Sequence, residues 1–290
     1  MNIVVCIKQV PDSTHIRVHP VTNTIMRQGV PAVINPYDLF AIEEALRIRD
    51  AHGGKVTVIT MGPPPAAVAL RKALAYGCDE AVLITDKIFS GADTLATSYV
   101  LASAISMLGK EQPVDLVFTG KQTIDGDTAQ VGPGIAKRLD LELLTYVAKI
   151  VAVDQAAGKI QVERRAEGGV QLLETRLPAL ITMLEGSNEM RFGTAPDVFR
   201  AARAEIRTWD RNSAGIEDIK KVGLKGSPTI VSRVFGPTPR DEKAEQIAFD
   251  PAAPEVATAA LLEKILADSP KVAKELARHQ AGEHAGARHE

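Results

Sequence analysis

Short apolar runs alternate with longer amphipathic stretches through the first half of the chain. Residues 3–7 form a continuous apolar run rich in β-branched side chains, which is typical of a strand buried on both faces. Asn35 and Pro36 then open a stretch in which apolar residues recur every three or four positions, as they do in a helix that covers a sheet. The pattern predicts strands at residues 3–7, 55–61, 80–85 and 114–119, and helices at residues 37–51, 63–77, 94–108 and, at least in part, 126–139.

The pattern changes after residue 140, where strand-like segments follow one another with no long helix between them. Glycine-containing turns at residues 156–158 and 167–169 separate some of these segments. We expect them to be antiparallel additions at the edge of the sheet, one of them a hairpin. The fold class is therefore α/β, with a doubly wound, mainly parallel sheet. The predicted additions are residues 142–153, 159–165, 169–175 and 179–183.

The last part of the chain is irregular. Regular alternation ends after Asn188, and residues 223–250 are rich in proline, glycine and charge. Because such a stretch is too long for an ordinary loop, we interpret it as an arm that lies on another chain. One more helix at residues 255–266 precedes a polar tail from residue 278, which its composition predicts to be disordered. The expected parts are an α/β domain at 1–187, a loop, helix and connection at 188–222, and the arm, helix and tail at 223–290.

Composition narrows the classes of function. Apolar residues make up 45% of 290 residues, which is enough for a sizeable core, and 34 basic against 36 acidic residues do not favour a nucleic-acid or lipid surface. Two cysteines without CxxC or metal-type spacing argue against a disulfide scaffold and against a metal site. The apolar N-terminus is short, and no run is long enough to span a membrane, so we expect a cytoplasmic protein.

The most informative segment for chemistry is residues 118–133. Neither GxGxxG nor GxxxxGK[ST] is present, and no histidine lies beside a nucleophile or a carboxylate pair, so no catalytic side chain is predicted. In this segment a strand ends at Thr119, and polar and small residues lead into a helix, the place where ligands bind in open α/β sheets. Asp127 or Thr128 is expected to cap that helix and leave N–H groups for an anion, while Asp125 is suited to accept from a ribose or adenine. Spacing alone slightly favours an ordinary turn and cap.

Two further segments are candidates. Residues 91–98 also enter a helix after a strand, and Thr94 and Thr97 are three apart, so both hydroxyls can face the same way. Taken alone, this segment is better explained by an ordinary N-cap, formed by Asp93 or Thr94. Residues 223–229 offer the cation of Lys225 and two hydroxyls, but alone they indicate only a turn.

Five stretches of the sequence are distinctive: VCIKQVPD at residues 5–12, NPYD at 35–38, MGP at 61–63, GKQTIDGDTAQV at 120–131, and VERRAEGGVQ running on to LPALIT at 162–182. Through these anchors the chain resembles, from Met1 to about Val231, the β subunits of electron-transfer flavoproteins. The resemblance implies an adenine-nucleotide α-hydrolase-like sheet and a bound adenine nucleotide.

In ordinary members of that family the nucleotide is AMP, whereas electron-bifurcating members bind a second FAD in the same place. Gly126 stands where AMP-binding members tend to carry a third acidic residue, and residues 91–97 and 223–229 also resemble the bifurcating group. The resemblance therefore implies FAD, with AMP as the alternative. The implied cofactor-binding residues are Cys6, Asn35, Pro36, Tyr37, Asp38, Met61, Gly62, Thr94, Thr97, Gly120, Lys121, Gln122, Thr123, Ile124, Asp125, Gly126, Asp127, Thr128, Ala129, Gln130, Val131 and Lys225.

The resemblance also implies partners. It predicts a heterodimer with an electron-transfer flavoprotein α subunit, in which NADH reduces the flavin on this chain. One electron then passes to ferredoxin or flavodoxin and the other, through the α-subunit FAD, to an acyl-CoA dehydrogenase-type enzyme. Residues 188–198 resemble the loop that anchors the family to acyl-CoA dehydrogenases, although many members carry leucine in place of Ala195. The alternatives are a non-bifurcating carrier that holds AMP, and a universal-stress-like or adenosine-nucleotide α/β hydrolase that works without a partner.

Overall fold

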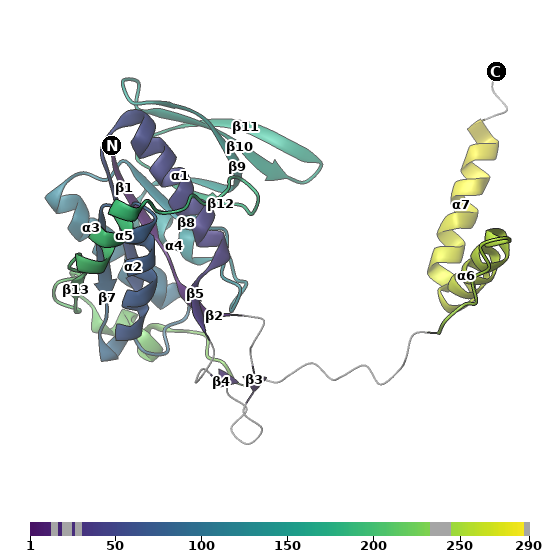
Figure 1. Cartoon of the computed structure of the whole chain (residues 1–290), viewed down its shortest axis with the longest axis horizontal. Helices are drawn as coiled ribbons and strands as arrows, with labels where there is room; N and C mark the ends of the chain where they lie inside the picture. Colours follow the sequence, from purple (N-terminus) through teal and green to yellow (C-terminus); the bar gives the residue numbers. More distant parts are fainter. Residues whose placement is uncertain (13–16, 19–24, 27–30, 233–244, 287–290) are drawn as a thin grey trace. The chain divides into compact units, whose positions relative to one another are not determined.

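The computed structural model describes residues 1–12, 17–18, 25–26, 31–232 and 245–286. Contacts within the chain divide it into two units, Met1–Phe235 and Gly236–Glu290. The first unit contains the sheet and the helices that cover it, and the second contains two helices (Figure 1).

Nine strands of the described chain form one sheet, in the order β11-β10-β9-β12-β8-β1-β6-β7-β13. Neighbours from β9 to β13 are parallel, and β10 and β11 add antiparallel pairs at one edge. This confirms the predicted fold class. The strands are β1 (Asn2–Cys6), β6 (Lys55–Met61), β7 (Glu80–Ile84), β8 (Leu116–Gly120), β9 (Glu142–Asp154), β10 (Lys159–Ala166), β11 (Gly169–Arg176), β12 (Ala179–Met183) and β13 (Arg207–Trp209).

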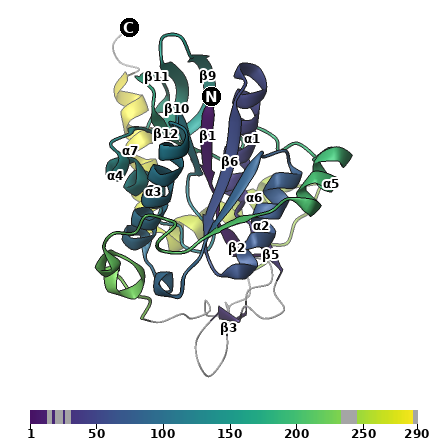
Figure 2. The same cartoon turned by 90° about the vertical axis from the view of Figure 1, so that its left-hand side faces the viewer.

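Helices cover both faces of the sheet (Figure 2). Helices α1 (Pro36–His52) and α2 (Ala67–Ala75) lie on one face, and α3 (Thr94–Glu111) and α4 (Val131–Leu139) lie on the other. Because successive residues of a strand point to opposite faces, Ile3 and Val5 join the core under α1 and α2, whereas Val4 and Cys6 join the core under α3 and α4. This explains why the first strand is apolar at every position.

The order of strands reverses at β1. The chain adds β6 and β7 on one side of β1 and then returns to place β8 on the other side. Right-handed crossovers in opposite directions put their helices on opposite faces, so the chain runs to one face of the sheet after β1 and to the other face after β8. In open α/β sheets this switch point, at the carboxyl ends of the strands, is where ligands bind.

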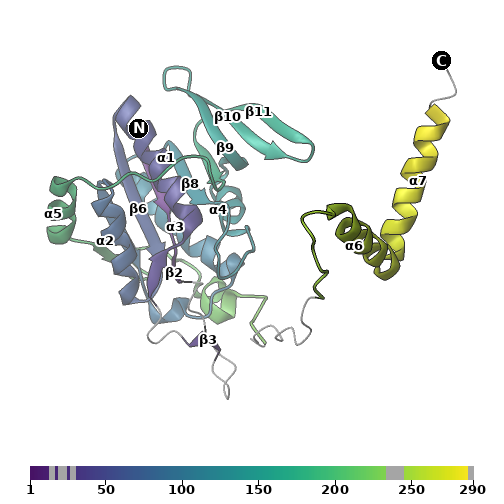
Figure 3. The ribbon, with the colours of Figure 1, turned by 45° about the vertical axis from the view of Figure 1, so that its right-hand side comes forward.

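The predicted antiparallel additions are only partly correct. Strand β12 pairs in parallel with β8, and the first half of β9 pairs in parallel with β12. Only the second half of β9 turns away to form an antiparallel meander with β10 and β11, which extends from the sheet (Figure 3). Strand β9 therefore belongs to both the parallel sheet and the antiparallel meander. Its sequence pattern is the same along its length and does not show where one part ends and the other begins.

Helix α4 begins at Val131, five residues later than the first residue predicted for it. Residues 121–130 form a loop in which Asp127 and Ala129 have φ values of 53° and 54°, and an α-helix excludes this left-handed geometry. The N-cap is Gln130, so the prediction that Asp127 or Thr128 caps the helix is wrong.

Regular elements also occur between Asn188 and residue 222, where the sequence predicted a loop, a helix and a connection but no strand. Helix α5 (Ala195–Arg203) is capped by Thr194, whose hydroxyl accepts from the Asp197 N–H, and β13 then pairs with β7. The smaller elements of this unit are β2 (Gln9–Pro11), β3 (Arg17–Val18), β4 (Ile25–Met26), β5 (Ala32–Ile34), η2 (Pro64–Ala66), η3 (Lys87–Phe89), η4 (Ile219–Lys221) and η5 (Gly223–Gly226).

The second unit contains α6 (Pro254–Asp268), close to the predicted helix, and α7 (Pro270–Gly286). The prediction of a disordered tail from residue 278 is wrong as far as Gly286, because α7 continues through it. No residue of α6 is buried, and its exposed apolar side chains include Val256, Leu261 and Leu262. Part of the predicted arm, residues 233–244, lies outside the described residues.

Candidate functional site

Asp38, in the first turn of α1, fastens the ends of β1 and β8 to each other. Its Oδ2 accepts a hydrogen bond from the Lys8 N–H at 2.7 Å, and its Oδ1 accepts one from the Gly120 N–H at 3.1 Å. Only 4% of the residue is exposed. Burial raises the pKa of Asp38 to about 7, although its hydrogen bonds favour the ionised form. A single buried carboxyl group thus holds together both sides of the switch point.

Gly120 is required by this arrangement. A Cβ atom there would lie 2.5 Å from Asp38 Oδ1 and 2.6 Å from the backbone carbon of Tyr37. Real Cβ atoms do not approach backbone this closely, so the glycine allows the end of β8 to touch the start of α1.

Asn35 shapes the loop that follows β8. Its Nδ2 donates to the Gln122 carbonyl at 2.8 Å, and its Oδ1 accepts from the Ile124 N–H at 3.1 Å. The residue is fully buried and makes no side-chain cap for α1. Because both amide atoms bind loop backbone, Asn35 positions residues 122–124 at the switch point.

Lys8 and Asp125 form an ion pair across the same edge, with Lys8 Nζ 2.8 Å from Asp125 Oδ1. The Asp125 side chain is 15% exposed. Burial raises its pKa, but the hydrogen bond and the charge of Lys8 outweigh burial, so the pKa lies below the usual range. Sequence reasoning missed this pair, although Lys8 belongs to the first matching anchor. The carboxylate expected to accept from a ribose already has a partner.

Residues 126–129 form a strained turn before α4. The N–H groups of Gly126 and Asp127 donate to the Thr123 carbonyl, and Gln122 Nε2 donates to Asp127 Oδ1 at 2.8 Å. The left-handed geometry of Ala129 costs about 1 kcal/mol for a residue with a Cβ atom. A strained backbone conformation is kept only where the surrounding contacts hold it in place, and such residues often lie beside binding sites.

The N-terminus of α4 has no side-chain cap. The N-cap residue, Gln130, instead directs its Oε1 to the Thr94 hydroxyl, which donates to it at 2.9 Å. The N–H groups of Val131 and Gly132 therefore remain without a side-chain acceptor at the positive end of the helix dipole, whereas Pro133 has no N–H to offer. This end is suited to an anion.

The N-terminus of α3 is capped by Asp93, as one of the two interpretations of this segment expected. Asp93 Oδ1 accepts from the N–H groups of Leu95 and Ala96 at 2.9 and 3.0 Å. Its Oδ2 accepts from the N–H and the hydroxyl of Thr229 at 3.1 and 2.8 Å. Together with the Thr94–Gln130 bond, these contacts join all three candidate segments, residues 91–98, 120–131 and 223–229.

The other predicted residues lie around this edge in different environments. The Cys6 side chain is buried under α3 and α4, where burial raises its pKa, so only its backbone is left to face a ligand. Lys121 Nζ lies 5.4 Å from the centre of the Tyr37 ring and 5.8 Å from that of Tyr146. Lys225 is exposed in η5 and has no ion-pair partner among the described residues. The remaining positions are Met61 and Thr97, half-buried; Gly62, whose N–H donates to Ile84; and Pro36 and Thr128, exposed.

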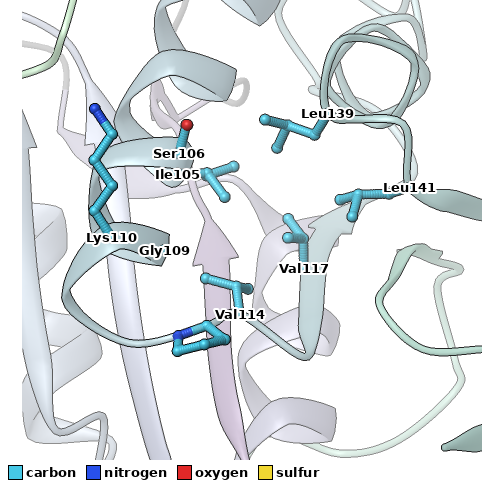
Figure 4. Close-up of a pocket in the computed structure, with 9 residues that line it drawn as sticks. Ile105, Ser106, Gly109, Lys110, Val114, Val117, Leu139 and Leu141 are labelled. Carbon is cyan, nitrogen blue, oxygen red and sulfur yellow. The ribbon is translucent and has the colours of Figure 1, made fainter.

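A separate cavity of about 350 Å³ lies between α3 and α4, beside the start of β8 (Figure 4). Apolar side chains such as Val114, Val117 and Leu139 dominate its lining, and the one charged group there, Lys110, is beside Met107 Sδ at 3.3 Å. Converging polar groups, which mark a ligand site, are missing from its lining. Because Pro113 and Val114 in its lining precede β8, the cavity lies at the amino end of that strand, away from the candidate site at the carboxyl end.

A doubly wound sheet with hydrogen-bonded loops at its switch point places the chain in the class of α/β proteins that bind ligands at that edge. Residues 22–214 match the electron transfer flavoprotein domain. The chain is 64% identical over 278 residues to the protein FixA of Azotobacter vinelandii, covering 96% of this chain and 99% of that one. It is 48% identical over 248 residues to the electron transfer flavoprotein subunit beta of Thermoanaerobacterium thermosaccharolyticum, covering 85% and 92% of the two chains. The chain belongs to the electron transfer flavoprotein family.

This membership confirms the resemblance to the β subunits and assigns the chain to electron transfer. A β subunit works with an α subunit, and the family associates with flavin nucleotides. The alternative of a hydrolase unrelated to electron transfer therefore loses its basis. Within the described residues, no helix combines the length and the apolar character that crossing a bilayer requires.

Proposed function

We propose that this chain is the β subunit of an electron-bifurcating electron-transfer flavoprotein and binds FAD at the carboxyl ends of β1 and β8. The supporting observation is the continuity of the three candidate segments. Asp93 binds Thr229, and Thr94 binds Gln130, so residues 91–98 and 223–229 extend the edge formed by residues 120–131. An edge built from all three segments is longer than one built from residues 120–131 alone. This length suits FAD, which consists of an AMP part and a further flavin part.

The two helix N-termini at this edge differ in charge. The carboxylate of Asp93 already occupies the end of α3, whereas the end of α4 has no side-chain cap. A phosphate group is therefore favoured at α4 and repelled from Asp93. Gly126 adds no third carboxylate to Asp125 and Asp127 in this loop, which leaves room and less negative charge for a second phosphate group.

The roles of this chain are to bind and to orient. Bound FAD would supply the redox chemistry, accepting hydride from NADH and delivering electrons to ferredoxin or flavodoxin and, through the α-subunit FAD, to an acyl-CoA dehydrogenase-type enzyme. Asp38 and Asn35 would hold the loops in place, α4 would bind phosphate, and Thr94, Thr97 and Lys225 would serve the part of FAD beyond AMP. The alternative is a non-bifurcating β subunit that holds AMP at the same edge.

The regions outside the sheet would bind protein partners. Helix α6 exposes the apolar side chains of Val256, Leu261 and Leu262. Because exposed apolar surface of this kind marks a site of protein contact, we assign the second unit to contact with the α subunit. Residues 188–198 would face the dehydrogenase, and Phe192 in this segment is 95% exposed.

Counting nucleotides tests the proposal directly. Heating the purified heterodimer releases its nucleotides, which chromatography then separates and quantifies. Two FAD molecules and no AMP per heterodimer are expected. One FAD with one AMP would contradict bifurcation and support the alternative.

Replacing Gly126 by glutamate should change which nucleotide is bound. A Cβ atom at this position would meet only Thr123 Oγ1, at 3.4 Å, and the residue is exposed, so the melting temperature should change little. The added carboxylate should repel a second phosphate near α4, and we expect the ratio of FAD to AMP affinities to fall about tenfold. Isothermal titration with each nucleotide measures this ratio.

Gly126→Gln is the matched control, because it adds the same bulk without charge. If the glutamine variant loses FAD as strongly as the glutamate variant, space and not charge sets the preference. If neither variant alters the ratio, residue 126 does not face the phosphate groups.

A further inference from the structure

Asp93 makes more hydrogen bonds than a helix cap needs. Its Oδ1 alone satisfies the N–H groups of Leu95 and Ala96. Its Oδ2 is used entirely by Thr229, which donates both its N–H and its hydroxyl. The N–H of Asp93 donates in turn to Ser227 Oγ at 2.8 Å. One residue therefore holds the start of α3 and the segment 227–229, which is more than 130 residues away in the chain.

The segment that Asp93 holds is closely seated. A Cβ atom on Gly223 would lie 2.0 Å from the Ile88 carbonyl oxygen, and one on Gly226 would lie 2.1 Å from the backbone carbon of Lys221. Ser227 Oγ also donates to the Gly223 carbonyl at 2.7 Å. These contacts give η5, and with it Lys225, a defined place beside α3.

Asp93 also connects this segment to the nucleotide edge. The next residue, Thr94, donates its hydroxyl to Gln130, the N-cap of α4. A hydrogen-bonded path thus runs from Thr229 through Asp93 and Thr94 to the end of α4. Burial raises the pKa of Asp93, but its hydrogen bonds outweigh burial and keep the pKa below the usual range, so the carboxylate is ionised at neutral pH.

We propose that Asp93 is a positioning residue for nucleotide binding, which through Oδ2 fixes residues 223–229 against α3 as the wall that recognises FAD beyond its AMP part. This inference rests on the proposed function, because it needs FAD at this edge. Asp93 does not touch the ligand in this role. It determines where Lys225 and the hydroxyls of the segment lie.

Thr229→Val tests the inference, because valine has nearly the shape of threonine and removes the hydroxyl donor while the cap of α3 stays intact. Asp93→Asn is the second variant: its side-chain oxygen can still cap α3, but its amide group offers Thr229 no acceptor. The full chain, purified with its α subunit, is titrated with FAD and separately with AMP. Thr208→Val, an exposed change on β13, is the matched control.

We expect both variants to weaken FAD binding about tenfold while AMP binding stays within twofold of the unaltered complex. The control should change neither affinity. A merely structural role would weaken both nucleotides equally, or would lower the melting temperature without selectivity, and either result would overturn the inference. Unchanged FAD affinity in both variants would overturn it as well, while leaving the proposed function intact. An unaltered complex that binds AMP but no FAD at this edge would remove the proposed function and this inference together.

Discussion

Asp38→Ala is expected to lower the free energy of unfolding by about 2–4 kcal/mol, because two N–H groups lose their acceptor. The carboxylate accepts from the N–H groups of Lys8 and Gly120, and alanine offers neither bond. The methyl group also leaves space where the side chain was almost completely buried. Urea unfolding followed by circular dichroism measures the loss. Nucleotide binding should weaken too, because the loops after β1 and β8 are then no longer fastened together.

Asp38→Asn is the control for this prediction. Asparagine keeps one oxygen acceptor and almost the same volume, so its loss of stability should lie between those of the unaltered chain and the alanine variant. An alanine variant as stable as the asparagine variant would show that the two hydrogen bonds contribute little.

The same carboxyl group should make stability depend on pH. Burial raises the pKa of Asp38 from 3.8 to about 7 in the folded chain, so the folded state holds a proton that the unfolded state has already released. Stability should therefore decrease as the pH rises from about 4 to about 7, by up to about 1.4 kcal/mol per pH unit, and level off above pH 7. The difference in stability between the unaltered chain and Asp38→Asn isolates this contribution. A difference that grows with pH in this range would contradict it.

Arg191→Met is the second large prediction, with an expected loss of about 3 kcal/mol in the free energy of unfolding. Arg191 Nε donates to Glu43 at 2.8 Å and its Nη1 donates to Asp50 at 2.6 Å. The Glu43 side chain is only 4% exposed, so removing Arg191 leaves a buried carboxylate with one remaining cation, Arg47. The segment 188–198 would then be held to α1 mainly by Asn188, which donates to the Phe40 carbonyl and to Glu44. Under the proposed function, electron transfer to the dehydrogenase-type partner should slow.

Arg47→Met is the matched control, since Arg47 also pairs with Glu43. Its side chain is 49% exposed and lies one helical turn away on the same helix, so its loss should cost less than about 1 kcal/mol. An equal loss of unfolding free energy in the two variants would contradict this prediction. It would mean that Glu43 needs both cations equally and that the bond from Arg191 to α1 adds nothing by holding residues 188–198.

The predictions that succeeded depended on local patterns. The strand at residues 55–61 and the start of the helix at Thr94 match β6 and α3, because alternation along a strand and a side-chain cap are local signals. The start of α4 was missed because Asp127 and Thr128 are good caps by composition, while the actual loop geometry depends on Asn35, a residue far away in the sequence.

Candidate residues show the same division. The choice of residues 120–131 as the candidate site follows from their place after a buried strand and from their resemblance to a known family, and it stays a prediction. The ion pair between Lys8 and Asp125 does not follow, because it joins residues 117 positions apart. The left-handed geometry of Tyr146 is equally hidden: it lies in β9, where its N–H donates to Thr182 Oγ1 beside a shift in the strand register.

The sequence by itself determined the family, the alternation of strands and helices, and the three polar segments that follow buried strands or turns. These properties depend on residue order over short distances, where apolar periodicity and turn chemistry act directly. Only the tertiary structure decided that the three segments meet, because the switch in strand order at β1 and the carboxylates of Asp38 and Asp93 bring distant backbone groups together. Hydrogen bonds of this kind need burial and exact geometry, and both arise only when the sheet is complete.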